Sequence, residues 1–515
     1  MDNTINSFHI FEALYISLTL YILNIIIVSY LIEGVLFMAK NKIKSSVGDK
    51  LSPLNWFNVC LFCLIGGIAW NLENMYFNTF LYNSVYAGAS AEALAGTMEP
   101  TTAISRMVAL SAITAVVTTF IMGTFSDRMK NRKIFISIGY IVWGGTTALF
   151  GFITKENIAG LFNLSDAAQI LTLTVWAVII MDMVMTFMGS TSNDSAFNAW
   201  VTDITTPVTR PKVETSFTFV GFLAMGIVMG VGTAAQTGAV SYKIFFGLLG
   251  LLVSCAGVVG LFTIKEPAHI TKPAKNTSYW ADLFYGFKPS VIKENSTLYL
   301  FLLAMCLFNC AFQVFFPYLI VYLQYVVLES SANKLLLENS LPTIIIVAVI
   351  AVAILVAGVI FLMKLSAKKK LLGIIPGVAA LIVGLLILST STSFYTILAG
   401  IAPTFIGYLV LTIQFGATIR DYTPPEKAGL FQGIRMIFFV LIPMVVGPAI
   451  GDIACRSAGA VYTTENIVGN EIVRVDTPVP DAKMFLYSAV VAALVFIPLF
   501  ILSKNLKKQP QKTEE

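Results

Sequence analysis

Long apolar runs separated by short polar segments recur along almost the whole chain. A helix needs about 20 mostly apolar residues to cross a hydrocarbon core roughly 30 Å thick. The runs that can do so are 14–32, 56–82, 105–125, 134–153, 170–193, 215–236, 242–264, 298–325, 342–363, 371–388, 394–418, 431–451 and 485–502. The pattern therefore predicts an all-α integral membrane protein with thirteen spans.

The basic residues between these runs gather on one side. The segments 39–54, 126–133, 204–214, 265–296, 364–370, 419–435 and 503–515 hold 26 of the 33 Lys and Arg residues. Short loops rich in Lys and Arg stay in the cytoplasm. We therefore expect a cell (inner) membrane protein with its N-terminus outside and its C-terminus in the cytoplasm.

The first run precedes a unit of twelve. A signal peptide would need a basic segment before its apolar core, but Asp2 and Glu12 precede this run, so an extra helix is the preferred interpretation. The expected division is 1–50 for this helix and its linker, 51–264 and 297–503 for two six-helix halves, 265–296 for the cytoplasmic loop between them, and 504–515 for the tail.

Two sequence patterns occur at corresponding places in the two halves. Residues 71–81 and 309–319 both read N-x5-F-x-x-[FY]-L, and residues 203–207 and 421–425 both read D-x-T-x-P. Matches in the same order indicate a duplicated unit. This is the organisation of transporters that rock two halves about a site near the membrane midplane.

Composition narrows the class further. Hydrophobic residues make up 57% of the chain and charged residues 12%, about half the charged share of a soluble domain. The net charge of +5 follows from the loop lysines and indicates no nucleic-acid partner. His9 and His269 lie outside the runs, and no phosphate-binding loop is present. We therefore expect no enzyme, no metal and no cofactor.

A basic loop between the second and third spans of the first half carries a recognisable pattern. Residues 123–133 read GTFSDRMKNRK, which resembles the G-x-x-x-D-[RK]-x-G-[RK]-[RK] loop of the major facilitator superfamily. The resemblance implies a twelve-helix major facilitator fold plus one extra N-terminal helix. It also implies gating roles for Gly123, Asp127, Arg128 and Arg132. Lys130 and Asn131 depart from the pattern, and a plain basic turn is the alternative.

The densest polar run inside a span is 189–195, which includes Asp194. A carboxylate at this depth costs on the order of 3 kcal/mol and usually has a functional reason. Residues 189–205 resemble a segment of the glycoside–pentoside–hexuronide:cation symporters, the melibiose permease-like family. The resemblance implies that Asp194 serves both cation and sugar and that Thr191 serves the cation. Asn198 stands where that family has a sugar-stacking Trp, and Trp200 lies two residues on.

The same resemblance has gaps that affect the coupling ion. The paired acids of the family's second helix fall on Ala115 and Thr119. A sodium site needs several oxygen ligands, so a proton is preferred as the coupling ion. Loss of coupling stays open.

Other polar residues inside the spans are candidates with simpler alternatives. Glu73 and Asp182 are predicted as further protonatable groups. The residues predicted to contact substrate are Asn71, Asn74, Asn198, Trp200, Asn309, Gln313 and Gln414. Bonds between helices would explain the amides equally well. Arg420, Asp421 and Arg435 are predicted to form a cytoplasmic gate, with a solvated loop as the alternative.

These observations favour cation-coupled uptake of a small solute, a sugar or glycoside, by a monomer in the lipid bilayer. A transporter of amphipathic organics, drugs or lysolipids is a close alternative, because the spans hold few cationic side chains and many Phe and Met. A membrane-embedded enzyme or sensor is the remaining alternative.

Overall fold

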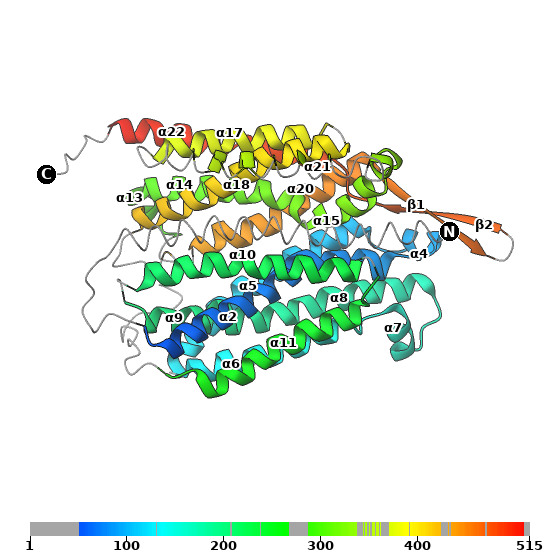
Figure 1. Cartoon of the computed structure of the whole chain (residues 1–515), viewed down its shortest axis with the longest axis horizontal. Coiled ribbons are helices and arrows are strands. Elements are labelled where there is room, and N and C mark those ends of the chain that lie inside the picture. The colour runs from blue at the N-terminus through cyan, green and yellow to red at the C-terminus, as the bar shows by residue number, and fades with distance from the viewer. Residues whose placement is uncertain are drawn as a thin grey trace. The chain divides into compact units, whose positions relative to one another are not determined.

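The computed structural model describes residues 51–129, 131–206, 209–236, 238–266, 287–336, 370–390, 392–423, 431, 434–468 and 471–508, with isolated positions between 343 and 361. These residues form a helical protein with one β-hairpin (Figure 1). The predicted span 14–32 and most of 342–363 lie outside the described residues.

Within the described part, nine helices are long and apolar enough to cross a membrane. They are Pro53–Tyr86, Pro100–Gly123, Arg132–Phe150, Ala167–Ile204, Tyr242–Thr263, Ser296–Leu328, Phe394–Ile419, Ile434–Ala458 and Lys483–Asn505. Two shorter apolar helices, Leu223–Gln236 and Gly373–Leu388, match two further predicted runs. The all-α membrane architecture predicted from the sequence is confirmed.

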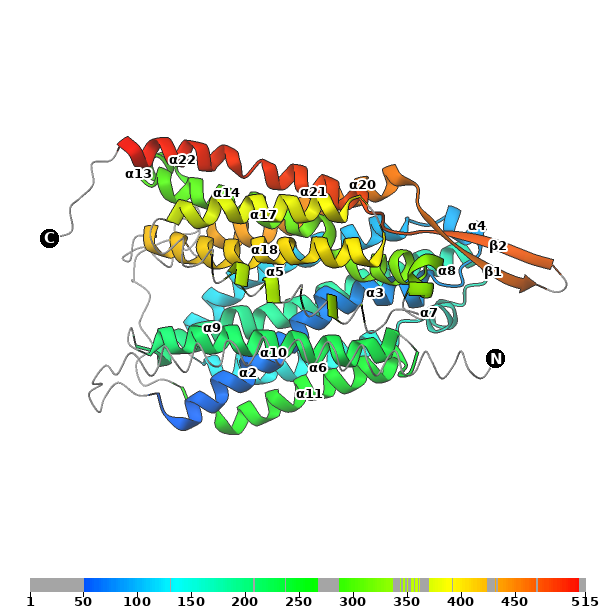
Figure 2. The ribbon, with the colours of Figure 1, turned by 45° about the horizontal axis from the view of Figure 1, so that its top comes forward.

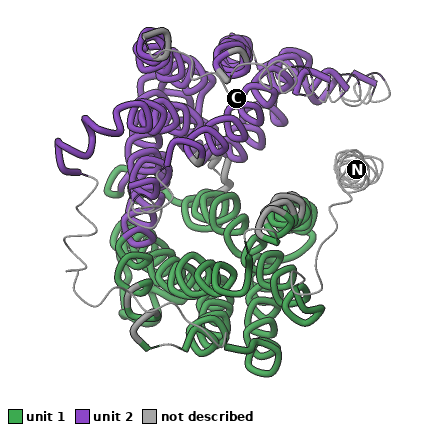
Figure 3. Tube along the Cα trace, turned by 90° about the vertical axis from the view of Figure 1, so that its left-hand side faces the viewer, with its two compact units in different colours: residues 1–97, 117–275 green, residues 98–116, 276–515 purple. Residues whose placement is uncertain are grey.

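The chain divides into two compact units. Unit 1 comprises Met1–Thr97 and Val117–Lys275, and unit 2 comprises Met98–Val116 and Asn276–Glu515 (Figure 3). Helix α5, Pro100–Met129, therefore contributes its first part to unit 2 and its second part to unit 1.

The elements of unit 1 besides α5 are α2 (Pro53–Leu72), η1 (Glu73–Phe77), α3 (Asn78–Phe80), η2 (Leu81–Tyr86), α4 (Ala91–Ala95), α6 (Arg132–Phe150), α7 (Lys155–Phe162), α8 (Ala167–Gly189), η3 (Ser190–Phe197), α9 (Asn198–Ile204), α10 (Arg210–Gln236) and α11 (Tyr242–Thr263). Here η1, η2 and η3 are π-helical stretches that continue the long helices. Such stretches inside α-helices are rare and often mark functional positions.

The elements of unit 2 besides α5 are α13 (Pro289–Glu294), α14 (Ser296–Phe315), η5 (Phe316–Tyr318), α15 (Leu319–Tyr322), η6 (Leu323–Leu328), α17 (Lys370–Leu388), α18 (Phe394–Tyr422), η8 (Ile437–Leu441), α20 (Ile442–Ala458), β1 (Val461–Val468), β2 (Glu471–Pro478), α21 (Lys483–Ala493) and α22 (Phe496–Lys508). Strands β1 and β2 pair antiparallel, with Val461 opposite Pro478.

The apolar pattern did not predict the β-hairpin. A two-stranded hairpin alone is at best marginally stable in water. Here Val475 and Val479 are buried, and Tyr462 packs on Tyr325 with ring centroids 5.0 Å apart. Contact with the helical part of unit 2 therefore stabilises the hairpin, which extends past the end of α20 (Figure 1).

Helices α6 and α11 lie side by side in unit 1 (Figures 1 and 2), and glycines let their backbones approach closely. A Cβ at Gly144 would collide with the Gly250 carbonyl oxygen and with Ser254. A Cβ at Gly257 would lie 2.5 Å from the Ser137 carbonyl oxygen. Small residues at such crossings permit dispersion contacts and polar bonds between membrane helices.

We expect Gly144→Val to destabilise unit 1 by about 1–3 kcal/mol, the usual cost of overpacking. Gly145→Val is the matched control, since a Cβ at Gly145 meets nothing within 4 Å. Thermal unfolding of the detergent-solubilised protein, followed by loss of the monodisperse species, compares the two. Equal midpoints for both variants would contradict the close packing at Gly144.

Candidate functional site

Asp194 lies inside the long span Ala167–Ile204, which runs as α8, η3 and α9 without a break. The predicted run ended at residue 193, so the helix extends well past the expected boundary and encloses the carboxylate. The Ser190 hydroxyl donates to Asp194 Oδ2 at 3.1 Å. Asp194 thus lies in a π-helical stretch with a hydroxyl partner one turn earlier.

Thr191 and Ser192 bond to their own helix. The Thr191 hydroxyl donates to the Phe187 carbonyl at 2.7 Å, and the Ser192 hydroxyl to the Met188 carbonyl at 2.8 Å. Such i−4 bonds are common for Ser and Thr within helices. They occupy the hydroxyl protons and leave the Thr191 oxygen able to accept or to ligate.

The structure joins Glu73 to the span that carries Asp194. Glu73 begins η1, and its Oε1 accepts from the Thr186 hydroxyl of α8 at 3.0 Å. Asp182 lies one helical turn before Thr186, and all three side chains are buried. The two acids that the sequence analysis named separately therefore both neighbour Thr186.

The asparagines Asn71 and Asn74 of the span Pro53–Tyr86 use their amide groups within their own helix. Asn71 Nδ2 donates to the Gly67 carbonyl and Asn74 Nδ2 to the Trp70 carbonyl, each at 2.7 Å. Both side chains are half-buried. Their carboxamide oxygens are the groups that a bound solute could still use.

One partly buried chain of hydrogen bonds was not predicted from the sequence. Trp70 Nε1 donates to Asn193 Oδ1 at 3.2 Å, and Asn193 Nδ2 donates to the Tyr140 hydroxyl at 2.6 Å. Tyr140 in turn donates to the Phe62 carbonyl at 2.9 Å. This chain holds α2, α6 and η3 together directly beside Asp194.

Trp200 and Asn198 also have defined partners. Trp200 is fully buried, and its indole Nε1 donates to the Lys265 carbonyl at 3.1 Å. Asn198 is exposed, and its Nδ2 donates to the Asp194 carbonyl at 3.2 Å. Trp200 thereby fixes the chain where α11 ends.

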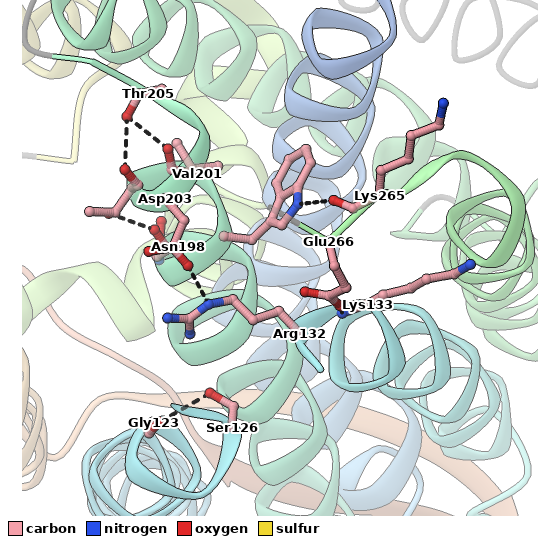
Figure 4. A network of polar contacts seen from close by, with 12 residues as sticks. Gly123, Ser126, Arg132, Lys133, Asn198, Val201, Asp203, Thr205, Lys265 and Glu266 are labelled. Carbon is pink, nitrogen blue, oxygen red and sulfur yellow. Dashed lines mark hydrogen bonds and ion pairs between the residues drawn. The ribbon is translucent and has the colours of Figure 1, made fainter. Parts of the chain in front are cut away.

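The basic loop carries a buried ion pair. Arg132 Nε lies 2.6 Å from Asp203 Oδ2, and the two side chains are 7% and 11% exposed (Figure 4). The backbone N–H of Lys133 donates to Glu266. Arg132, predicted as a gating residue, is thus paired with the Asp of the first D-x-T-x-P segment.

The other predicted gating residues of this loop are less informative. A Cβ at Gly123 would lie 3.6 Å from Ser195 Oγ, an ordinary contact, so no described neighbour demands glycine there. Asp127 and Arg128 belong to α5, but their side chains lie outside the described part.

Breaking the buried ion pair should be costly. We expect Arg132→Met to destabilise the protein by about 3 kcal/mol, because Asp203 would lose its buried cationic partner. The double variant Arg132→Met, Asp203→Asn should recover part of that loss, and Lys133→Met removes a neighbouring positive charge as the control. Thermal unfolding in detergent measures all three variants. An unchanged unfolding midpoint for Arg132→Met would contradict a stabilising ion pair.

In unit 2 the predicted amides fall on two packed helices. Asn309 and Gln313 lie one turn apart on α14, and both are half-buried. Gln414 is buried on α18. Helix α14 packs against α18, where Phe312 stacks on Tyr408 with ring centroids 4.4 Å apart.

The predicted gate of the second half is only partly described. Asp421 is exposed near the end of α18, and Arg435 is half-buried. The Arg420 side chain lies outside the described part. The pairing of these residues therefore stays a prediction.

Another buried acid, Asp452 on α20, was not predicted from the sequence. Its Oδ1 accepts from the Thr101 hydroxyl at 2.8 Å, and both of its oxygens accept from the Thr102 hydroxyl at 3.0 Å. Arg456 Nε lies 3.2 Å from Oδ2. The Tyr318 hydroxyl donates to the Pro448 carbonyl at 2.7 Å and thereby anchors α20 from η5.

Apolar spans with buried acids, hydroxyl partners and amide-bearing faces define a polytopic membrane protein that handles a polar solute or ion. A model of the Major Facilitator Superfamily matches residues 72–448. The chain belongs to this superfamily. It is a transporter of small-molecule solutes and not an enzyme.

Solved structures agree on the fold. The nucleoside transporter NupG, crystallised as a mutant, is 13% identical, with a TM-score of 0.55, covering 87% of this chain and 98% of that one. A bacterial homologue of the human lysosomal transporter Spinster, inward-facing and occupied, is 12% identical, with a TM-score of 0.58, covering 90% and 100%. The xylose transporter XylE from E. coli is 12% identical, with a TM-score of 0.53, covering 89% and 99%. No curated protein matches the chain in sequence.

Proposed function

We propose that this transporter takes up a sugar or glycoside together with a proton, by alternating access. The observation that carries the proposal is Asp194, a carboxylate held inside a span, in a π-helical stretch, against the Ser190 hydroxyl. An ionisable residue at membrane depth usually serves ion or substrate handling. Binding and release of a proton there would change the charge of the span during each cycle.

The residues around Asp194 support a polar solute. Its neighbour Asn193 is bonded to Trp70 and Tyr140, and these bonds fix the orientation of the Asn193 side chain beside Asp194. Asn71 and Asn74 keep carboxamide oxygens that can accept from hydroxyl groups. In unit 2 the candidates for substrate contact are Asn309, Gln313 and Gln414. Asn198 and Trp200 of unit 1 are further candidates, which the family resemblance implies.

A proton suits the described acids better than sodium. Sodium binding would need several oxygen ligands around one point, and the second helix offers Ala115 and Thr119 where the resembling family has acids. Among the described residues, no group of three or more His, Cys, Asp or Glu is placed to hold a metal ion. Glu73 and Asp182 are the further acids that we assign to proton handling, and Thr191 stays a candidate ligand.

The remaining assignments rest on the sequence. We place the protein as a monomer in the cell membrane, with the N-terminus outside and the C-terminus in the cytoplasm. We divide it into an extra first helix, two six-helix halves, a cytoplasmic loop between them and a tail.

Uptake into proteoliposomes tests the proposal. A panel of labelled glycosides and pentosides is offered under an inward proton gradient, a sodium gradient or no gradient. Accumulation driven by the proton gradient supports proton–sugar symport. Accumulation driven by sodium would overturn the assignment of the ion. No uptake of any sugar would overturn the substrate class and favour amphipathic organics or lysolipids.

A further inference from the structure

Four polar side chains recur at every fourth position along the span that carries Asp194. They are Asp182, Thr186, Ser190 and Asp194. Side chains four apart lie on one face of a helix. The bond from Ser190 to Asp194 shows that this face continues into η3. Two hydroxyls therefore stand between two acids along one helix face, and Glu73 joins it from η1.

The hydroxyls of this face differ from others on the same span in what they bond. Thr174, Thr191 and Ser192 donate to carbonyls of their own helix. Thr186 and Ser190 donate to carboxylates, those of Glu73 and Asp194.

The surroundings keep these groups away from bulk water. Thr186 and Ser190 are fully buried, and Glu73 is 7% exposed. On the neighbouring surface of the same helix, a Cβ at Gly189 would lie 2.8 Å from the Trp143 ring, so an indole packs close beside Ser190. A hydroxyl can donate and accept at once, which is what passing a proton through an apolar region requires.

We infer that Glu73, Thr186, Ser190 and Asp194 form one proton path, which we name the acid–hydroxyl row. The inference rests on the proposed function and deepens it, because it makes the two acids a single coupled site instead of two independent ones. Asp182, next to Thr186 on the same face, extends the row at the Glu73 end.

The transfer balances with one water between the two hydroxyls. The protonated Asp194 carboxyl gives its proton to Ser190 Oγ, and Ser190 gives its own proton to the water. The water passes one of its protons to Thr186 Oγ1, and Thr186 gives its proton to Glu73. One O–H bond breaks and one forms at each hydroxyl and at the water, so the net result is a carboxylate at Asp194 and a carboxyl at Glu73.

Comparing exchange with accumulation separates this role from a structural one. Thr186→Val and Ser190→Ala are expected to lose accumulation under a proton gradient by about a hundredfold or more, the scale of a lost proton-transfer group. Exchange of labelled for unlabelled substrate at equal pH should stay within about twofold, because it needs no net proton movement. Thr186→Ser should restore accumulation, and Thr174→Val, buried on the same helix, should lose neither. If the Thr186→Val and Ser190→Ala proteins accumulate substrate as well as the Thr174→Val protein does, the acid–hydroxyl row is overturned.

An infrared pH titration tests the row without any substrate. The carboxyl band of Glu73 is identified by its loss in Glu73→Gln. We expect Asp194→Asn to shift this band in the wild-type background and to leave it unchanged in Thr186→Val. If Asp194→Asn leaves the Glu73 carboxyl band of the otherwise wild-type protein at the same position, the acid–hydroxyl row is overturned. Wild type that takes up no sugar but shows the coupled bands would overturn the proposed substrate and keep the row.

Discussion

Replacing Asp194 with Asn is expected to abolish proton-driven accumulation of the solute, with a loss of about a hundredfold or more in the initial rate. The amide keeps the size of the side chain and can still accept from the Ser190 hydroxyl. It cannot bind and release a proton, so the span would lose the charge change on which coupling depends. Uptake into proteoliposomes with and without a proton gradient measures the effect.

A matched carboxylate on the same helix is available as the control. Asp166 caps the N-terminus of α8, where its Oδ2 accepts from the Gln169 backbone N–H at 3.0 Å, and it is exposed. Asp166→Asn makes the same chemical change outside the span and should leave the rate within about twofold of wild type, since Asn also caps helices well. Accumulation by Asp194→Asn at the wild-type level would remove Asp194 from the coupling mechanism.

Two of the π-helical stretches, η1 and η3, hold a candidate acid. Glu73 begins η1 and Asp194 lies in η3, and each accepts from a hydroxyl of the span Ala167–Ile204. A π-turn widens the helix and displaces its side chains relative to regular α-helical positions. At Glu73 and Asp194 the altered helical repeat therefore coincides with an ionisable group, whereas η2 carries no acid and Asp182 lies in the regular helix α8.

The helices could be predicted from the sequence because the membrane imposes a length and a polarity on each span. The end of the fourth span could not, since 190–195 is too polar to read as part of an apolar run. The structure continues the helix through it by bonding hydroxyls such as Thr191 and Ser192 to backbone carbonyls. The hairpin Val461–Pro478 was missed because it lies between two apolar runs, and a search for runs of about 20 apolar residues does not detect strands.

The acids of the candidate site could be found because a carboxylate in an apolar run stands out. Their partners could not. Thr186 lies 113 positions from Glu73, and Asn193 lies 123 positions from Trp70, and only the packing of helices brings them together. Asp452 was missed for a simpler reason, because the predicted run ended at residue 451 and left this acid just outside the membrane.

Asp452→Ala is expected to destabilise the protein by about 3 kcal/mol. The carboxylate is 5% exposed and accepts from Thr101 and Thr102, and removing a charged acceptor leaves buried donors without a partner. The bond to Arg456 adds little, because that side chain is half exposed and water screens the charge. Thermal unfolding in detergent should show a clear drop in midpoint.

Further variants distinguish the contribution of the hydrogen bonds to Asp452 from the contribution of its charge. Asp452→Asn keeps an oxygen acceptor for the Thr101 hydroxyl and should lose less than Asp452→Ala. The pair Thr101→Val, Thr102→Val removes the donors and leaves the carboxylate buried, so it should cost at least as much as Asp452→Ala. Asp476→Ala on the exposed part of the hairpin is the control. If Asp452→Ala and Asp476→Ala both unfold at the wild-type midpoint, the bonds of Asp452 to Thr101 and Thr102 contribute nothing to stability. Apolar packing alone would then hold the start of α5 to α20.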